Sequence, residues 1–177
     1  MKRLITLFDR GVATLSAAAA GLAAAILLAI FLVVQLEVVL RFVFERPTSW
    51  SHEVSTFAIC WVGFLAAGHV LRLGRHLEVD VLTSRISRKS RLVLGTATDA
   101  IAFIFCAYAC YIGVRFVDIA FLMKATSASE IDTPLWIPYL AIPIGFGIFA
   151  LEFLARLFSR WDLVEHRDPD FKVLTAD

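Results

Sequence analysis

The sequence predicts an all-α integral membrane protein with four transmembrane helices, a short interfacial amphipathic helix between the second and the third, and both termini in the cytoplasm. Its 177 residues are 59% hydrophobic and 19% charged, with a mean hydropathy of +0.78. This is more apolar than the core of a soluble domain of the same length requires. Four largely uncharged runs are long enough, or nearly so, to cross a hydrocarbon core of roughly 30 Å.

Each predicted span contains at most one Asp, Glu, Lys, Arg or His. The runs cover residues 11–34, 54–71, 92–114 and 135–151. The first run follows "MKR" and is similar to a secretory signal peptide, but it exceeds the roughly 7–15 apolar residues of such a peptide. We therefore interpret it as a retained helix. Asp99, in the third run, has no evident partner on its own helix, so an acidic site facing another helix remains open.

The orientation follows from the basic residues, because cytoplasmic flanks carry an excess of Lys and Arg. Thirteen of the 17 basic residues precede the first run, lie between the second and third runs, or follow the fourth. The other four lie in the two remaining connections. We therefore expect cytoplasmic termini, a four-helix membrane domain over residues 1–160 and a cytoplasmic tail over residues 161–177.

The connection between the second and third runs combines apolar and basic residues. Helical spacing relates five of its residues, Leu77, Val81, Leu82, Arg85 and Ile86, which is typical of a helix lying in the membrane interface. The basic residues at positions 88, 89 and 91 would then face phospholipid phosphates. A solvated basic loop is the alternative reading of the same pattern.

Polar residues near the ends of the spans form two i, i+4 pairs. Glu37 and Arg41 follow the first run, and Glu152 and Arg156 follow the fourth. Side chains at such positions can extend to the interface, so we interpret both pairs as membrane anchors rather than as an ion path.

Two features bear on helix packing. Ala17, Gly21 and Ala25 place small residues at every fourth position of the first run, a spacing that lets a neighbouring helix approach closely. That neighbour could belong to this chain or to another subunit. In the fourth run, Pro143 followed by two glycines predicts a kink within the membrane.

The residue types that would indicate a cofactor or an enzyme are sparse. Only His69 lies within a span, so the sequence does not predict a haem held between two histidines. There is no phosphate-binding G-x-x-x-x-G-K-[ST] run, and a net charge of +1 does not indicate nucleic acid as a partner. We predict no cofactor, no bound metal and no catalytic residue.

The stretch "RFVFERPTSWSHEVSTFAICWVGFLAAGHVLRLGRHLEVDVL", residues 41–82, carries the most specific pattern. It resembles the signature region of the small, Q-type membrane subunits of tripartite ATP-independent periplasmic (TRAP) transporters. The matching positions are Arg41, Phe42, Pro47, Trp50, Glu53, Trp61, Gly63, Gly74, His76, Val79 and Asp80. His52 departs from the pattern, because the family often has a second acid there, which puts any role for paired carboxylates in doubt.

The resemblance implies a scaffold in the bacterial inner membrane rather than an enzyme. Such subunits bind a large multi-span membrane subunit, and a periplasmic substrate-binding protein delivers the substrate. Uptake is symport driven by an ion gradient, commonly of sodium, and the substrates are organic acids such as C4-dicarboxylates or sialic acids. No substrate-binding residue is assigned by the resemblance. The alternative is a stand-alone helical bundle that serves as a membrane anchor or a small channel.

Six residues of this region are candidates for assembly or for contact with the membrane interface: Arg41, Trp50, Glu53, Trp61, His76 and Asp80. We expect Trp50 in an aromatic belt, with Glu53 at the positive N-terminal end of the second helix. One helical turn separates His76 from Asp80, so the two could pair or could both face a partner.

Overall fold

A computed structural model describes residues 2–45, 48, 50–73, 88–129 and 132–167. These residues form helices α1 (Lys2–Phe42), α2 (Trp50–Leu73), α4 (Arg88–Leu122), α5 (Trp136–Tyr139) and α6 (Ala141–Arg167). Within this described part, four helical segments are long and apolar enough to cross a membrane: Arg3–Phe42, Trp50–Leu73, Val93–Leu122 and Trp136–Ser159. The four predicted spans are therefore confirmed, and each extends beyond its uncharged run.

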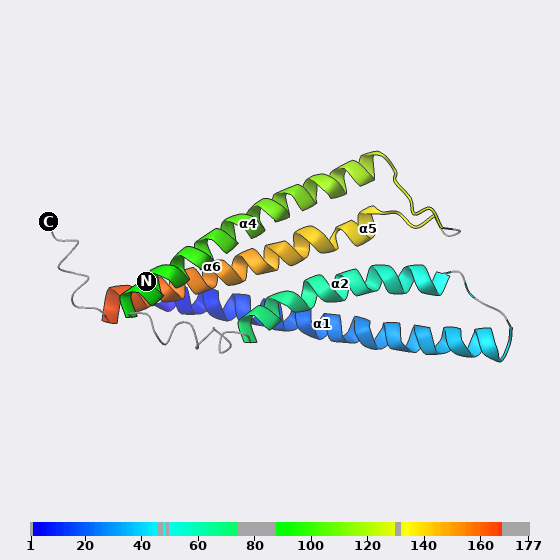
Figure 1. The fold of residues 1–177 in the computed structure, drawn as a ribbon, viewed down its shortest axis with the longest axis horizontal. Helices are drawn as coiled ribbons and strands as arrows, with labels where there is room; N and C mark the ends of the chain where they lie inside the picture. The colour runs from blue at the N-terminus through cyan, green and yellow to red at the C-terminus, as the bar shows by residue number, and fades with distance from the viewer. Residues whose placement is uncertain (1, 46–47, 49, 74–87, 130–131, 168–177) are drawn as a thin grey trace.

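The helices form two antiparallel pairs, α1 with α2 and α4 with α6 (Figure 1). The pairs lie together at the end of the molecule that carries the N-terminus and the end of α6, which we name the terminal end. They separate toward the other end, where α2 and α5 begin, which we name the hairpin end. Helix α6 packs against every other described helix and is the centre of the bundle.

Two alanines and two larger apolar residues form the buried contact between the two pairs. Ala19, Ala23, Leu65 and Ile148 make the buried cluster, and Trp61 packs against it. Gly68 lets α2 approach α6 closely, because a Cβ atom there would lie 2.5 Å from Cγ2 of Ile148. With few large apolar side chains in the core, close helix contact supplies the packing energy, as is usual in membrane bundles.

The strip Ala17, Gly21 and Ala25 does not make this contact. All three residues are exposed, and no atom lies within 4 Å of a Cβ placed at Gly21. The buried face of α1 runs instead through Val12, Ser16, Ala19 and Ala23. Within the described residues, no neighbouring helix of this chain therefore packs on Gly21, the middle residue of the strip. Packing against another subunit stays a prediction.

Helix α4 buries one narrow face. The buried residues among those described, Asp99, Cys106, Gly113 and Ala120, recur at every seventh position, which is the repeat of two helices packed side by side. At Gly113 a Cβ would lie 3.0 Å from side-chain atoms of both Ile142 and Pro143. The remaining circumference of α4 is largely exposed apolar surface.

The fourth span is interrupted, but one turn earlier than the sequence suggested. The break lies at Leu140, between α5 and α6, and Pro143 is the third residue of α6. Proline has no backbone N–H, so Pro143 cannot donate to the carbonyl of Tyr139, four residues before it, and a continuous helix loses that bond. The predicted interruption is confirmed, and its position is corrected.

Two predicted features fall outside the described residues. The interfacial helix, with His76 and Asp80, lies in the segment 74–87, and most of the tail lies in residues 168–177. Helix α6 continues to Arg167, so helical structure extends past residue 161, where the tail was expected to begin.

Candidate functional site

An ion cluster joins three helices near the terminal end. The Arg72 guanidinium on α2 binds the Glu152 carboxylate on α6: Nε donates to both carboxylate oxygens at 3.0 Å, and Nη2 lies 2.9 Å from Oε2. Nη2 also lies 3.2 Å from Oδ1 of Asp9 on α1 and 3.4 Å from the Asp9 backbone carbonyl oxygen. We name Arg72, Glu152 and Asp9 the terminal clamp.

The terminal clamp is buried unevenly. The side chain of Glu152 is 1% exposed, that of Arg72 is 18% exposed and that of Asp9 is 37% exposed. Desolvating a charge costs several kcal/mol, and a buried ion pair recovers this cost only with close and multiple contacts. The fork of the guanidinium provides such contacts. Glu152 is therefore the carboxylate that depends most on Arg72, and Asp9 adds a weaker, more hydrated contact.

A second arginine holds the end of α2. Arg156 donates to the backbone carbonyl of Leu71, one of the last four carbonyls of a helix that ends at Leu73, which lack a partner within the helix. The same guanidinium lies 5.8 Å from the ring centroid of Phe153. The contact of Glu152 with Arg72 corrects the reading of Glu152 as an interfacial anchor. Glu152 is a buried residue that joins α6 to α2.

A second contact joins the two helix pairs near the hairpin end. Ser129, in the connection between α4 and α5, donates its hydroxyl hydrogen to the Glu53 carboxylate. Glu53 is 8% exposed, and the hydroxyl groups of Ser127 and Thr133 face the same carboxylate. We name Glu53 and Ser129 the hairpin clamp.

The connection that supplies Ser129 is shaped by its own backbone. Ser127 N–H donates to the Thr133 carbonyl at 2.9 Å, and Leu135 N–H donates to the Ala125 carbonyl at 2.9 Å. The two sides of this loop are thereby held together. As a result, the hydroxyl groups of Ser127, Ser129 and Thr133 face Glu53 on α2. Because Glu53 lies in the first turn of α2, its negative charge also faces the positive end of the helix dipole.

Glu37 closes the turn between α1 and α2. Its carboxylate accepts hydrogen bonds from the backbone N–H of Thr48, at 3.3 Å, and from the Thr48 hydroxyl. Arg41 Nη2 lies 3.4 Å from Glu37 Oε1, which confirms the predicted i, i+4 pair. Beside this contact is a cavity of about 300 Å³ between α1 and α2. It is lined by Val34, Glu37, Val38, Arg41, Phe42, Thr48, Ser51, His52 and Ser55.

The other predicted site residues take separate positions. Arg41 is exposed apart from its contact with Glu37, and Trp50 begins α2 with 41% of its surface exposed. Trp61 is half-buried against the central cluster, about two turns from Glu53. The structure thus does not gather them into one pocket. His76 and Asp80 are outside the described residues, and their role stays a prediction.

The sequence did not indicate the most buried contact. Arg72 was counted as a basic residue of a connection, and Glu152 as an anchor. The usable signal was a pair of opposite charges near the same membrane surface, on the second and fourth spans. Ser129 gave no signal, since a serine in a loop is ordinary.

Four apolar spans, with buried charges that join helices to one another, define a multi-pass membrane protein whose polar residues hold a bundle together. Comparisons with known proteins specify the family. Residues 30–163 match the family profile described as tripartite ATP-independent periplasmic transporters, DctQ component. The chain therefore belongs to the DctQ family of small TRAP transporter subunits. It is a component of a transporter, not an enzyme.

Individual relatives agree with this family. The C4-dicarboxylate TRAP transporter small permease protein DctQ of Rhodobacter capsulatus is 29% identical over 124 residues, which cover 67% of this chain and 53% of the relative. A putative TRAP transporter small permease protein of Haemophilus influenzae is 27% identical over 72% of this chain and 78% of the relative. The isethionate TRAP transporter permease protein DctMQ of Oleidesulfovibrio alaskensis is 22% identical over 61% of this chain, which corresponds to 17% of that longer protein. The chain thus spans about half of the Rhodobacter protein and a minor part of the longer one.

Proposed function

We propose that this small TRAP permease subunit is a scaffold that supports a large multi-span membrane subunit in ion-gradient-driven uptake of organic acids. The main support for the proposal is that buried charged side chains bind other parts of the same chain. Arg72, Glu152 and Glu53 each bind a group on another element of the chain. Charges that are held in this way fix the positions of helices, and they are poorly suited to bind and release a moving solute.

We infer the substrate class and the coupling ion from the family to which the chain belongs. The named relatives include permeases for C4-dicarboxylates, isethionate and sialic acid, which are all organic anions. We propose an organic acid of this kind as the transported solute and symport with sodium as the driving process. A periplasmic substrate-binding protein would deliver the solute, and the large subunit would hold it.

The membrane setting supports a role for phospholipids. We place the chain in the bacterial inner membrane, with the hairpin end toward the periplasm. The exposed apolar faces of α1 and α4 suit acyl chains. The cavity beside Glu37 combines apolar walls with the exposed Arg41, which suits the boundary between acyl chains and headgroups.

The orientation can be tested with single cysteines in a variant that lacks the three native ones. A cysteine at Glu45 or Ala128, exposed residues near the hairpin end, should react with a membrane-impermeant maleimide added to intact spheroplasts. A cysteine at Ser84 or Thr175 should react only after the membrane is permeabilised, because we place both on the cytoplasmic side. Labelling of Ser84 in sealed spheroplasts would reverse the proposed orientation.

The scaffold role predicts a stable complex. Coexpressed with the large TRAP membrane subunit of the same bacterium, the tagged chain should retain that subunit through detergent purification and gel filtration. An unrelated multi-span carrier, expressed at the same level, serves as the control and should not be retained. Elution of the chain without the large subunit, at expression levels where both are inserted, would exclude this function.

A further inference from the structure

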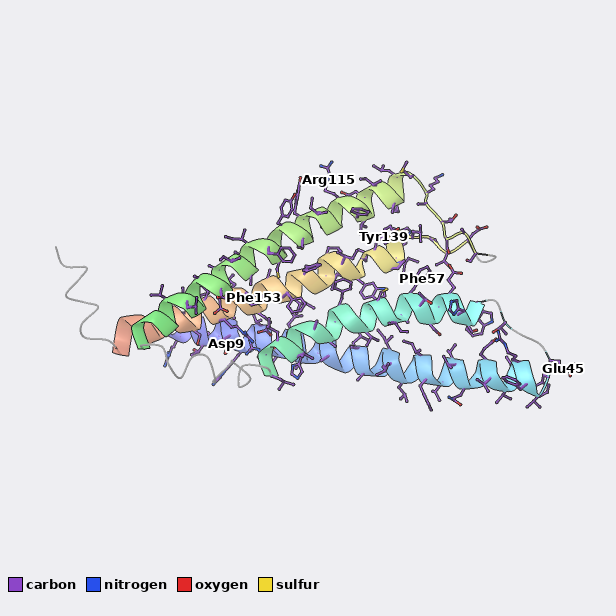
Figure 2. All side chains as sticks on the ribbon, viewed as in Figure 1. Asp9, Glu45, Phe57, Arg115, Tyr139 and Phe153 are labelled. Carbon is purple, nitrogen blue, oxygen red and sulfur yellow. The ribbon has the colours of Figure 1, made fainter. Side chains whose placement is uncertain are left out.

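Helix α4 carries polar side chains on the side that faces away from the bundle. Tyr108, Tyr111, Arg115 and Asp118 follow one another at intervals of three or four residues and therefore share one face. Tyr108 is 64% exposed and Tyr111 is 58% exposed, and Arg115 and Asp118 are also exposed. Figure 2 shows Arg115 projecting from α4 away from α6. We name these four residues the polar α4 face.

This face is opposite the one that packs within the chain. Tyr111 and Arg115 are each two residues from the buried Gly113, which places them about 200° around the helix from it. In the described part of the chain, α4 packs against α5 and α6, and both lie on the buried side. No described residue therefore covers the two tyrosine hydroxyl groups.

The tyrosines lie deep in the membrane. Ring contacts of 6.2 Å pair Phe116 with Tyr139 and Phe121 with Trp136, so these aromatic residues form a band near the hairpin end, and Phe116 and Tyr139 are at its deeper edge. Tryptophan and tyrosine typically collect at the membrane interface. Tyr108 is eight residues before Phe116 in the same helix, or about 12 Å deeper along its axis. Half of the hydrocarbon core is roughly 15 Å thick, so Tyr108 lies near the middle of the bilayer.

The direction of the Tyr108 side chain keeps its hydroxyl group from reaching water at the nearer interface. Cα–Cβ bonds of a helix tilt toward its N-terminus, and the N-terminus of α4 is at the terminal end. The hydroxyl group of Tyr108 is thus directed away from the nearer interface. Acyl chains offer no hydrogen-bond acceptor, and an unbonded hydroxyl group is costly in hydrocarbon. Lipid is therefore a poor cover for this face.

We infer that the polar α4 face binds a transmembrane helix of the large TRAP subunit, with hydrogen-bond acceptors at the level of Tyr108 and Tyr111 and complementary charges at the level of Arg115 and Asp118. This inference rests on the proposed function. A second copy of the chain fits less well. Two copies inserted in the same direction are related by an axis normal to the membrane, which brings Arg115 opposite Arg115 at one depth, where like charges repel.

The contact is tested by a photo-crosslinking residue. p-Benzoylphenylalanine at position 108 or 111, in the chain coexpressed with the large TRAP subunit of the same bacterium, should give on irradiation a product with the combined mass of the two subunits. A product with twice the mass of the chain would assign the face to a second copy, and adducts with phospholipid alone would assign it to lipid. Either result overturns the inference.

The hydroxyl groups are tested by removing them alone. The double variant Tyr108→Phe, Tyr111→Phe keeps both rings, and it should lower the yield of the purified complex at least threefold while the yield of the separately expressed chain is unchanged. Tyr139→Phe, which removes a phenolic hydroxyl outside this face, is the matched control and should leave the complex intact. An unchanged yield for the double variant would overturn the inference. Retention of the large subunit by the unmodified chain, measured in the same experiment, shows separately whether the proposed function stands.

Discussion

Replacing Glu152 by alanine is expected to lower the free energy of unfolding of the chain in detergent by roughly 3 kcal/mol. The reason is the charge that remains: Arg72 is 18% exposed and makes three of its contacts with this carboxylate. A hydrogen bond between neutral side chains of membrane helices contributes less, about 0.6 kcal/mol on average. The size of the loss therefore separates an ion pair from an ordinary contact. Denaturation followed by tryptophan fluorescence measures it.

Two further variants identify the cause of that loss. Asp9→Ala removes the carboxylate that is 37% exposed and should lower the same free energy by under about 1 kcal/mol, because water already screens that contact. The double variant Arg72→Leu, Glu152→Leu should recover most of the stability, since apolar residues often replace a buried ion pair without cost. Equal losses for Glu152→Ala and Asp9→Ala would show that the terminal clamp is no more than a surface contact.

Replacing Gly145 by valine is expected to destabilise the bundle by about 2 kcal/mol, within the range for overpacked cores. A Cβ at this position would lie 2.6 Å from both Cβ and Cδ1 of Phe64 on α2. Since Cβ is fixed to the backbone, α2 and α6 must move apart to accept it. Thermal unfolding of the purified chain in detergent gives the loss.

Gly63 offers a matched control for the Gly145 variant. It is also a helical glycine, and no atom lies within 4 Å of a Cβ placed there. Gly63→Val should therefore have only the small effect of a β-branched residue in a helix. Adding Phe64→Ala to Gly145→Val should restore part of the lost stability by making room. If the two glycine variants were equally stable, the close approach of α2 to α6 would not be a feature of the folded chain.

The spans could be predicted from the sequence because their signal is local. A run of about 20 apolar residues is excluded from water whatever its neighbours are, and so 11–34 already indicates the helix that the structure extends to Lys2–Phe42. The pair of Glu37 and Arg41 was also predictable, because one helical turn fixes its geometry.

Contacts between distant segments could not be obtained in this way. In "LSAAAAGLAAA" small residues occur on every side of the helix, so spacing alone did not distinguish Ala17 and Gly21 from the buried Ala19 and Ala23. The partner of Glu152 is 80 residues away on another helix. It becomes evident only when α2 and α6 are placed side by side.

Transport by reconstituted subunits tests directly whether the transporter requires this chain. Three preparations of proteoliposomes would contain this chain alone, the large TRAP subunit alone, or both. The periplasmic substrate-binding protein and a labelled organic acid are added outside, and an inwardly directed sodium gradient is imposed across the membrane. We expect uptake only where both membrane subunits are present, because the large subunit would hold the solute and this chain would fix the position of the large subunit in the membrane. Uptake by this chain alone, or equal uptake by the large subunit with and without it, would contradict a scaffold that the transporter requires.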